Sequence, residues 1–554
     1  MVKLNTKFMD ESIGFYSQYE NELEYNVLNA IRDICEDNLS ISDIIEQRGN
    51  HIYEHISDWR ETLLEWYPFK QGTKILEVGT GFGALTGVLL DKADRVVSLE
   101  IKKSRSEIIK ERYKDSTKLE VLNINFCYYD TDEKYDYIVI HDIFGYVKNY
   151  HDIHNGYVNM LRKLSNLLSD DGVILIATEN QLGIKYFSGS IEEYSNKFYT
   201  GLNNFDGYNY IRTFTKSEYI KMIQEAGFKY YKIYYPFPDC VFPTEIFTDK
   251  ILNYIYYGDK IYDATMPKFV FFNEQRLLRT LQNEGLVTAF ANAYLFEIST
   301  TNNLSNVLYY YVDASLNKGM KDMLITEGSD EYVNYSSNSG VQCKTIVIDK
   351  NMHVGTNYID LKSEVRLDQW IIRLLDSAAI GKVNTKEVVN KVEAILIKIC
   401  DAIRTIFTDS SISRTYITTK DVFLNNEDIK IVLTGPICTS FTVEFLIWKF
   451  ITEWYDKYIT GNKSFENIVD LYKLYKICSL NPVMSSDYRK HDKDNFNKYD
   501  NALAKYYHSR YLCNYSDPID IYNNGELITN GFCRKQYQLS EEAKEKFIIE
   551  KLRK

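Results

Sequence analysis

Three glycines and a glutamate have the types and spacing to bind a nucleotide-like ligand. Gly79, Gly81 and Gly83 occupy alternate positions between an apolar, strand-like run and a helix-like run. A glycine turn at the carboxyl end of a strand lets a ligand approach the backbone, because no side chain stands in the way. Glu100 ends the next strand-like run, where a carboxylate can accept hydrogen bonds from both ribose hydroxyls. The spacing therefore predicts a ligand that contains a ribose.

Glu77 distinguishes between two classes of ligand. The run from Gly79 to Ala84 also fits the G-x-G-x-x-A pattern of nicotinamide dinucleotide sites. Glu77 lies at the end of the strand, two residues before the first glycine. A pyrophosphate gains nothing from a carboxylate beside it, because the two charges have the same sign. Glu77 therefore disfavours a dinucleotide, which stays open as an alternative.

Alternating strand-like and helix-like segments predict the scaffold that positions these residues. The strand-like runs are continuous in Val, Ile and Leu, which is typical of a parallel sheet covered by helices on both faces. The expected strands are 74–79, 95–101, 119–124, 135–140, 172–178, 229–235 and 292–298. The expected helices are 84–93, 104–114, 157–168 and 216–228. We expect an α/β fold with a doubly wound, mostly parallel seven-stranded sheet, in which 292–298 is an edge strand.

The pattern along the chain predicts three regions. Residues 1–54 form an N-terminal helical segment, and 55–300 form the sheet domain, with a helical insertion at about 240–288. Residues 301–554 form a C-terminal α+β domain, in which an amphipathic helix begins at Asn384 with Glu387 at capping-box spacing.

Composition and charge exclude several classes of function. The formal net charge is −12, and no basic stretch is interleaved with aromatic residues, so nucleic acid is not the expected partner. No apolar run approaches the ~18 residues that a membrane span needs. Nine cysteines without a C-x-x-C pair indicate reduced thiols in a cytoplasmic protein. His151 and His154 have no third ligand nearby, so no metal site is expected.

Four of these segments resemble a known family in the right order. "LEVGTGFG" resembles motif I of class I S-adenosylmethionine (SAM)-dependent methyltransferases, and "VVSLEI", "YDYIVI" and "LSDDGVILIAT" resemble their second, fourth and fifth strands. Four longer phrases are similar to the methyltransferase domains of bacterial cell-surface glycan biosynthesis proteins. They are "WYPFKQGTKILEVGTGFGALTG", "ENQLGIKYFSG", "RTFTKSEYIKMIQEAGF" and "YPFPDCVFPTEIF". The resemblance covers about 55–300.

The resemblance implies a SAM site with residues from three strand ends. Glu77 would lie near the amino group of SAM, the glycine turn under its methionine and ribose parts, and Glu100 on the ribose. Asn125 and Phe126 stand where the family has residues that contact the adenine. The full set implied is Glu77, Gly79, Thr80, Gly81, Phe82, Gly83, Glu100, Asn125 and Phe126. The chain departs from the family at Gly145, where many relatives have a glutamate, so the role of that acid is in doubt here.

Methyl transfer to a hydroxyl needs alignment and a proton acceptor. His141, Asp142 and Glu179 follow the fourth and fifth strands and are the candidate general bases; a strand-end histidine bonded to a backbone carbonyl is the alternative for His141. For substrate binding, the candidates lie in or near the "ENQLGIKYFSG" loop and after the sixth strand. These candidates are Asn180, Tyr186, Tyr235 and Asp239.

The C-terminal half resembles the catalytic segment of small-molecule kinase-like folds, with Asp421 and Asn426 spaced as in a D-x-x-x-x-N loop. The later metal-binding acid is missing, since Leu433 and Thr434 stand there. This half is therefore interpreted as a degenerate module used for docking.

These observations predict a cytoplasmic SAM-dependent methyltransferase that O-methylates a sugar of a surface glycan or glycoprotein. The expected partners are a sugar or glycan acceptor and, in the same pathway, glycosyltransferases. Two alternatives stay open. One is a non-catalytic scaffold for glycosyltransferases, and the other is an NAD-dependent oxidoreductase.

Overall fold

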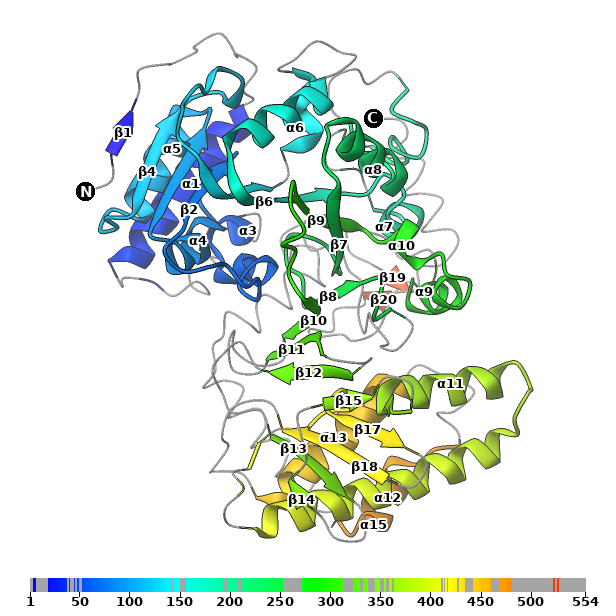
Figure 1. The fold of residues 1–554 in the computed structure, drawn as a ribbon. Helices are drawn as coiled ribbons and strands as arrows, with labels where there is room; N and C mark the ends of the chain where they lie inside the picture. The colour runs from blue at the N-terminus through cyan, green and yellow to red at the C-terminus, as the bar shows by residue number, and fades with distance from the viewer. Residues whose placement is uncertain are drawn as a thin grey trace. The chain divides into compact units, whose positions relative to one another are not determined.

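The computed structural model describes most of the first 312 residues and a helical part of the C-terminal half (Figure 1). The described residues are 3–5, 18–36, 39, 44, 47–48, 52–141, 143–149, 156–190, 192, 195, 197–206, 212–252, 272, 274–312, 322–328, 332–336, 344–348, 353–354, 358–360, 363–409, 412, 414–415, 417–425, 428–433, 442–459, 468–480, 522–523 and 526–527. They belong to two compact units. The first comprises Met1–Asp249, Lys260–Ser305 and Ala502–Lys554, and the second comprises Lys250–Asp259 and Asn306–Asn501.

A parallel sheet forms the centre of the first unit (Figure 1). Its strands lie in the order β4-β3-β2-β5-β6. They are β2 (Lys74–Val78), β3 (Arg95–Glu100), β4 (Leu119–Asn123), β5 (Tyr135–His141) and β6 (Leu168–Glu179). The helices α4 (Thr86–Lys92), α5 (Lys103–Arg112) and α6 (Gly156–Leu167) connect them. Successive strands are added outward on both sides of β2, which confirms the expected parallel core and places the switch point between β2 and β5.

The last strand of the sheet does not lie at the edge. The strand β9 (Ala293–Ser299) lies between β6 and β7 (Tyr230–Phe237) and runs antiparallel to both. All seven residues of β9 are buried. The expectation of an edge strand was therefore wrong, and the reason is physical. A strand that is apolar at nearly every position needs partners on both sides and cover on both faces.

Within the first unit, two further strands extend the sheet beyond the seven expected. The strand β1 (Lys3–Asn5) pairs with β4 in parallel, and β8 (Glu245–Thr248) pairs with β7 antiparallel. The strand β8 lies within the insertion that the sequence predicted as helical, so that prediction was wrong for its first part. The insertion also contains α9 (Glu274–Asn283) and ends near α10 (Val287–Phe290).

A buried acid attaches the N-terminal segment to β9. Glu297 accepts hydrogen bonds from Tyr67 Oη at 2.6 Å, Tyr234 Oη at 3.1 Å and the backbone N–H of Ser305 at 2.7 Å. Burial raises the pKa of Glu297, and these three donors act against that rise. The bonds join segments before β2 and after β9 to the same strand, which closes the sheet.

The N-terminal helices pack on the glycine turn. The helix α1 (Gln18–Cys35) buries Val27 and Ile31 in a cluster with Phe82 of the turn and Ile108 of α5. The short helices α3 (Tyr53–Ile56) and η2 (Asp58–Leu63) follow, and the Ser57 side chain caps η2 by accepting from the Trp59 N–H. The expected helical cap is thus present in the described part of 18–63, and it supports the turn from one side.

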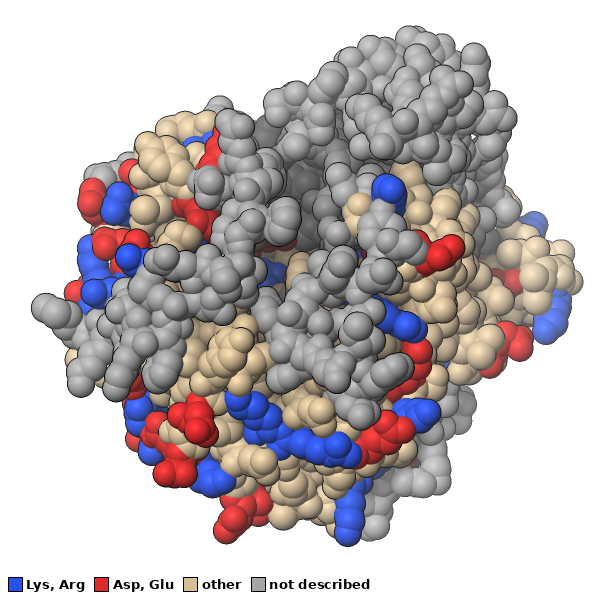
Figure 2. Space-filling model, turned by 90° about the horizontal axis from the view of Figure 1, so that it is seen from above, with Lys and Arg blue, Asp and Glu red and all other residues tan. Residues whose placement is uncertain are grey.

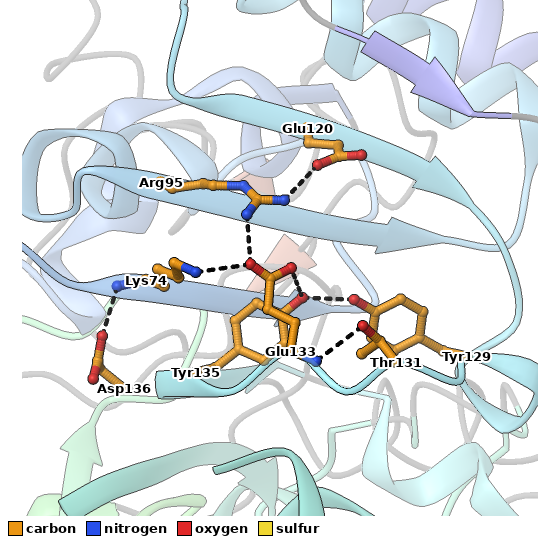
Figure 3. A network of polar contacts seen from close by, with 8 residues as sticks. All are labelled: Lys74, Arg95, Glu120, Tyr129, Thr131, Glu133, Tyr135 and Asp136. Carbon is orange, nitrogen blue, oxygen red and sulfur yellow. Dashed lines mark hydrogen bonds and ion pairs between the residues drawn. The ribbon is translucent and has the colours of Figure 1, made fainter. Parts of the chain in front are cut away.

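A polar network lies around the first residues of β2 and β3 (Figure 3). Glu133 Oε1 lies 2.9 Å from Lys74 Nζ and 2.5 Å from Arg95 Nη1, while Arg95 also pairs with Glu120 at 2.8 Å. Tyr135 Oη donates to Glu133 Oε2 at 3.3 Å. One carboxylate therefore joins the starts of β2 and β3 to the loop before β5.

We expect Glu133→Gln to destabilise the first unit by about 1–2 kcal/mol at pH 7, because two cations lose their shared partner. The pKa of Glu133 is lowered from 4.5, because the Lys74 hydrogen bond and the Arg95 charge outweigh its partial burial. An acid with a lowered folded pKa stabilises above its unfolded pKa and loses that effect as the pH falls. The gap between variant and wild type in thermal unfolding should therefore close below pH 4. Glu111→Gln, whose partner Lys114 is 3.6 Å away on an exposed helix face, is the control; an equal loss there would contradict the network.

The second unit contains antiparallel strands and a helical layer. Four of its strands lie in the order β10-β11-β12-β15, and five form a separate sheet with the order β14-β13-β18-β17-β16. The strands are β10 (Val307–Val312), β11 (Asp322–Glu327), β12 (Tyr332–Ser336), β13 (Lys344–Ile348), β14 (His353–Val354), β15 (Tyr358–Asp360), β16 (Val365–Arg366), β17 (Val422–Asn425) and β18 (Asp428–Leu433). The helices are α11 (Leu367–Ala379), α12 (Thr385–Thr408), α13 (Val443–Tyr458) and α15 (Leu471–Ile477). A small hairpin, β19 (Tyr522–Asn523) with β20 (Glu526–Leu527), belongs to the first unit.

The helix expected at Asn384 is α12. Asn384 caps it by accepting from the Lys386 N–H at 2.9 Å. The side chain of Glu387 does not form the predicted capping box. It pairs instead with Lys391, one turn later, at 2.7 Å. The expected apolar face is buried at Val388, Val392, Ile399 and Ile403.

The kinase-like segment has a different geometry from a catalytic loop. Asp421 is fully buried and accepts from the N–H and Oγ1 of Thr418 at 2.6 and 2.9 Å. The strand β17 begins at the next residue, Val422. Asn426 lies outside the described residues. Asp421 thus closes a turn before a strand.

Candidate functional site

The glycine turn after β2 has the conformation that glycine alone adopts easily. Gly79, Gly81 and Gly83 have φ angles of +78°, +60° and +76°. A Cβ on Gly79 would lie 2.4 Å from Ile143 Cγ2, whereas a Cβ on Gly81 would meet nothing within 4 Å. Gly79 is therefore required by packing against the segment after β5. Gly81 borders open space, which is what a site for a closely approaching ligand needs.

Glu100 shapes this turn from the end of β3. Its Oε2 accepts from the Gly81 N–H at 2.9 Å, and its Oε1 accepts from the Lys102 N–H at 2.9 Å. Burial raises the pKa of Glu100, and the charge of Arg105 and the two N–H donors act against that rise. Each carboxylate oxygen has a second lone pair, so the group can still accept from ribose hydroxyls.

Glu77 is bonded within the fold. Ser98 Oγ donates to Glu77 Oε2 at 2.6 Å, and Thr86 Oγ1 donates to Oε2 and Oε1 at 2.9 and 3.2 Å. Burial raises the pKa of Glu77 to about 7. The carboxyl group joins β2 and β3 to the first residue of α4, and its contact with the amino group of SAM stays a prediction.

The other residues expected at the cofactor have varied surroundings. The Thr80 side chain donates to the Leu99 carbonyl at 3.4 Å. Phe82 turns toward the N-terminal helices, with Arg105 Cζ 4.8 Å from the centre of its ring. Asn125 Oδ1 accepts from the Cys127 N–H at 2.9 Å and caps the turn η3 (Phe126–Tyr128). That bond leaves the Asn125 amide NH2 group able to donate, and its contact with adenine stays a prediction.

His141 lies at the end of β5 under a guanidinium group. Arg60 Nη2 is 3.2 Å from its Nδ1 and 3.4 Å from its Nε2. Loss of hydration lowers the pKa of His141 well below 6.5, the Arg60 charge lowers it further, and a hydrogen bond to the Cys240 backbone acts the other way. The imidazole is therefore neutral at pH 7. Asp142, the second candidate base, lies outside the described residues.

Glu179 ends β6 next to the end of β5 and belongs to a buried ion pair. Its Oε2 lies 2.8 Å from Lys185 Nζ, and both side chains are 1% exposed. Cys240 Sγ donates to Glu179 Oε1 at 3.2 Å. Cys240 thus contacts both His141 and Glu179, and the structure brings these two candidate bases together.

The four substrate-binding candidates make contacts within the fold. Asn180 donates to the carbonyls of Ala289 and Ala291 and accepts from the Leu182 N–H. Tyr235 Oη donates to Asp249 at 2.9 Å, and Asp239 accepts from two N–H groups after Pro238. Tyr186, in the short helix α7 (Ile184–Phe187), lies beside Lys185 Nζ, 5.1 Å from the ring centre. Tyr186 thus lies beside the ion pair, and a substrate contact by any of the four candidates stays a prediction.

The sequence did not single out Arg60, Lys185, Glu192 or Cys240. Arg60 and Cys240 lie more than 80 residues from His141 or in another loop, so no local spacing relates them. Lys185 is inside the "ENQLGIKYFSG" loop expected to line the acceptor site, and Glu192 follows that loop by three residues. The sequence could have indicated these residues only through charged side chains in segments without helical or strand periodicity. That pattern is also typical of an exposed loop, so it does not identify a buried site.

The surface and the side-chain clusters of the described residues give two further facts. On the face shown in Figure 2, acidic and basic side chains are interspersed. No helix within the described ranges is long and apolar enough to cross a membrane, and in the same ranges no three His, Cys, Asp or Glu side chains gather as metal ligands.

Known proteins match the first unit. Residues 48–233 match the family model for a methyltransferase domain. The chain is 30% identical over 91 residues to ribosomal RNA small subunit methyltransferase A of Borrelia garinii subsp. bavariensis, which is 16% of this chain and 31% of that relative. The match thus spans less than a third of the curated relative.

Solved structures of methyltransferases are also similar. One is the N-methyltransferase NodS from Bradyrhizobium japonicum WM9, at 17% identity over 22% of this chain and 67% of that chain, with a TM-score of 0.20. Another is phosphoethanolamine N-methyltransferase 1 from Haemonchus contortus, at 13% identity over 51% of each chain, with a TM-score of 0.29.

The family match covers the glycine turn, the parallel core and the ends of β5 and β6. Residues 48–233 are therefore a SAM-dependent methyltransferase domain.

Proposed function

We propose that the chain transfers the methyl group of SAM to a hydroxyl of a sugar in a surface glycan or glycoprotein. The contact between Ile143 and Gly79 carries the proposal. It puts the segment after His141 directly beside the glycine turn, and Glu179 ends the neighbouring strand. A cofactor on the turn and polar groups at the ends of β5 and β6 therefore lie on one edge of the sheet.

The residues of the turn fit SAM. A Cβ at Gly81 would enter open space, so the backbone there is accessible, and Glu100 is positioned to accept from a ribose. SAM supplies an electrophilic methyl group on a sulfonium when it is bound. The chain's part is to hold the cofactor through the turn, Glu100 and the Asn125 amide, and to hold the acceptor oxygen in line.

A hydroxyl acceptor must also lose a proton. The new oxygen–carbon bond forms as the sulfur–carbon bond breaks, and the proton passes to a base of the chain. His141 is neutral at pH 7 but a weak base, because its pKa is well below 6.5. Glu179 is a carboxylate whose oxygens contact Lys185 and Cys240. A carboxylate of higher pKa nearby would be the better acceptor.

The proposal that the acceptor is a sugar is supported by the loop that begins at Glu179. "ENQLGIKYFSG" resembles a phrase of glycan biosynthesis methyltransferases, and in this chain the loop contributes Lys185 and Tyr186. Polar and aromatic groups side by side suit a sugar, whose rings have both hydroxyls and an apolar face.

A non-catalytic scaffold for glycosyltransferases is the second candidate function. Gly145 in place of the usual glutamate and the buried Asp421 favour it. An NAD-dependent oxidoreductase has no observation in its favour beyond the G-x-G-x-x-A pattern. Calorimetry with SAM and with NAD tests that alternative directly.

We expect a fragment of residues 1–305 to bind SAM as tightly as the full chain but to methylate extracted glycan at least tenfold more slowly. The fragment keeps Ser305, which bonds to Glu297 and Lys232, and so contains its own closing strand. The C-terminal half would then serve acceptor recognition. The measurements are SAM calorimetry and transfer of a labelled methyl group. A fragment that also carries 502–554 through a flexible linker is the control, since those residues group with the first unit. Equal glycan methylation by the 1–305 fragment and by the full chain would contradict a role of the C-terminal half in acceptor recognition.

A further inference from the structure

A group of buried polar atoms lies between the end of β6 and the start of α8 (Lys216–Glu225), at residues that the sequence did not single out. Among the described residues, these side chains share a feature: each has a buried oxygen without a hydrogen-bond partner. They are Gln181 (Oε1), Ser190 (Oγ), Glu192 (both Oε) and Thr213 (Oγ1). Leaving such atoms unbonded inside a protein costs free energy, so an unbonded group of this size calls for an explanation.

Glu192 and Gln181 meet around Gly201. The Glu192 side chain is 1% exposed, and a Cβ on Gly201 would lie 2.8 Å from its Oε1 and 3.6 Å from Gln181 Cγ. Gln181 Nε2 donates to the Gly201 carbonyl at 2.8 Å, which fixes the amide so that its Oε1 is the remaining acceptor. The Ser190 N–H donates to the Lys185 carbonyl at 2.9 Å, which attaches Ser190 to the buried ion pair.

The charges around Glu192 come from that same ion pair. Lys185 favours the charged form of Glu192 and Glu179 disfavours it, so one buried ammonium serves two buried carboxylates. The Ser195 hydroxyl, which bonds with Thr200 at 2.7 Å, lies close enough to Glu192 to lower its pKa by hydrogen bonding, although it falls short of hydrogen-bond geometry with either Glu192 oxygen. Burial outweighs both and raises the pKa of Glu192 to about 7.

We propose that Gln181, Ser190 and Glu192 form the subsite that binds a pair of hydroxyl groups of the acceptor sugar, with the Glu192 carboxylate accepting from one of them. The subsite deepens the proposed function and rests on it. Gln181 Oε1 can only accept, and so can the Glu192 oxygens when Glu192 is ionised, so the ligand must then supply hydrogen-bond donors. Lys185 already brings a positive charge to the carboxylates, which disfavours a cationic ligand and favours neutral hydroxyls.

The subsite also has a consequence for stability. An acid whose folded pKa is raised destabilises the fold progressively as the pH rises from its unfolded to its folded pKa. Glu192→Gln removes this effect and keeps the shape. The variant should therefore melt at the same temperature as the wild type at pH 4.5 and at a higher temperature at pH 8. The same residue would thus cost stability and provide binding, as is common at functional sites.

The test uses the full-length chain with S-adenosylhomocysteine present and saturation-transfer NMR with the methyl glycosides of glucose, galactose and mannose. We expect at least one glycoside to bind the wild type, and Glu192→Gln to weaken that binding at least tenfold. Gly201→Ala, which places a methyl group beside Glu192 Oε1, should weaken it as well. Glu225→Gln on the exposed end of α8 (Lys216–Glu225) is the matched control and should bind as the wild type does. SAM calorimetry on every variant shows that the fold and the cofactor site are intact.

The outcomes separate this inference from the proposed function. Glycoside binding and glycan methylation that Glu192→Gln leaves unchanged would overturn the subsite and leave the sugar methyltransferase standing. A wild type that binds SAM but no glycoside and methylates no glycan would overturn both. Lower thermal stability of Glu192→Gln at pH 8 would show that Glu192 has partners within the fold, and this too would overturn the subsite.

Discussion

Gly81→Val should weaken SAM binding at least 100-fold in calorimetry, which corresponds to about 2.7 kcal/mol or more. Gly81 borders open space and has a φ of +60°, and its N–H is bonded to Glu100. A branched side chain would project into the space where the cofactor is expected. It would also resist the positive φ and so disturb the bond that positions Glu100.

A matched control separates lost binding from backbone strain. Gly285 has a φ of +70°, and a Cβ there would also meet nothing within 4 Å, but it follows α9 away from the turn. Gly285→Val therefore carries the same kind of strain, about 1–2 kcal/mol, without entering the site. We expect both variants to lose similar stability and Gly81→Val alone to lose SAM. Retention of SAM affinity within a few-fold by Gly81→Val would show that the turn is structural.

The parallel core could be predicted because its signal is local. Strands β2, β3, β5 and β6 are almost wholly buried, so each consists of a run of Val, Ile and Leu between helical segments. The glycine turn is visible for a similar reason, because three positive φ angles require three glycines within five residues. Both features depend on neighbours in the sequence.

The place of β9 could not be read in the same way, although its sequence contained a clue. The position of a strand in a sheet depends on which earlier strands still lack a neighbour when the chain comes back to the sheet. This depends on residues far apart in the sequence. Yet β9 is apolar on both faces, and Glu297 within it is fully buried. A strand with this pattern belongs inside a sheet, whereas an edge strand usually has polar positions that face solvent. The pattern itself therefore favoured the interior.

The candidate site was predictable in part, and the reason is again distance along the chain. His141 and Glu179 were found because each follows a predicted strand, and the carboxyl ends of parallel strands meet on one edge. Arg60 and Cys240, which contact them, come from a short helix and a loop with no periodic pattern. Glu192 is harder still, because nothing in a sequence separates a buried carboxylate from an exposed one in a polar loop.

Buried charge distinguishes the ends of β5 and β6 from the rest of the sheet. At the opposite end, Glu133 shares two cations and its pKa is lowered, so charge there stabilises the fold. Beside Glu179, two carboxylates share one ammonium, and the pKa of Glu192 is raised. The first arrangement is that of a structural network. The second is under-compensated, which favours the proposed ligand site there.

Lys185→Met should destabilise the first unit by about 3–5 kcal/mol at pH 8, because it leaves two buried carboxylates without their cation. That loss corresponds to a Tm lower by roughly 10 °C for a unit of this size. Since a neutral carboxyl group costs less to bury than a carboxylate, the loss should shrink at pH 5. Lys221→Met is the matched control: its side chain is 74% exposed and 3.8 Å from Glu225, so its Tm should change by about 1–2 °C.

The double variant Lys185→Met, Glu192→Gln identifies where the lost free energy resides. If Lys185 compensates both carboxylates, neutralising Glu192 in the Lys185→Met background removes one of the two uncompensated charges and should restore a large part of the lost stability. Additive effects, in which Glu192→Gln stabilises the Lys185→Met variant by no more than it stabilises the wild type, would mean that Lys185 compensates Glu179 alone. Thermal unfolding at pH 8 and pH 5 decides between them, because a coupling that is electrostatic must fade as the carboxyl groups take up protons.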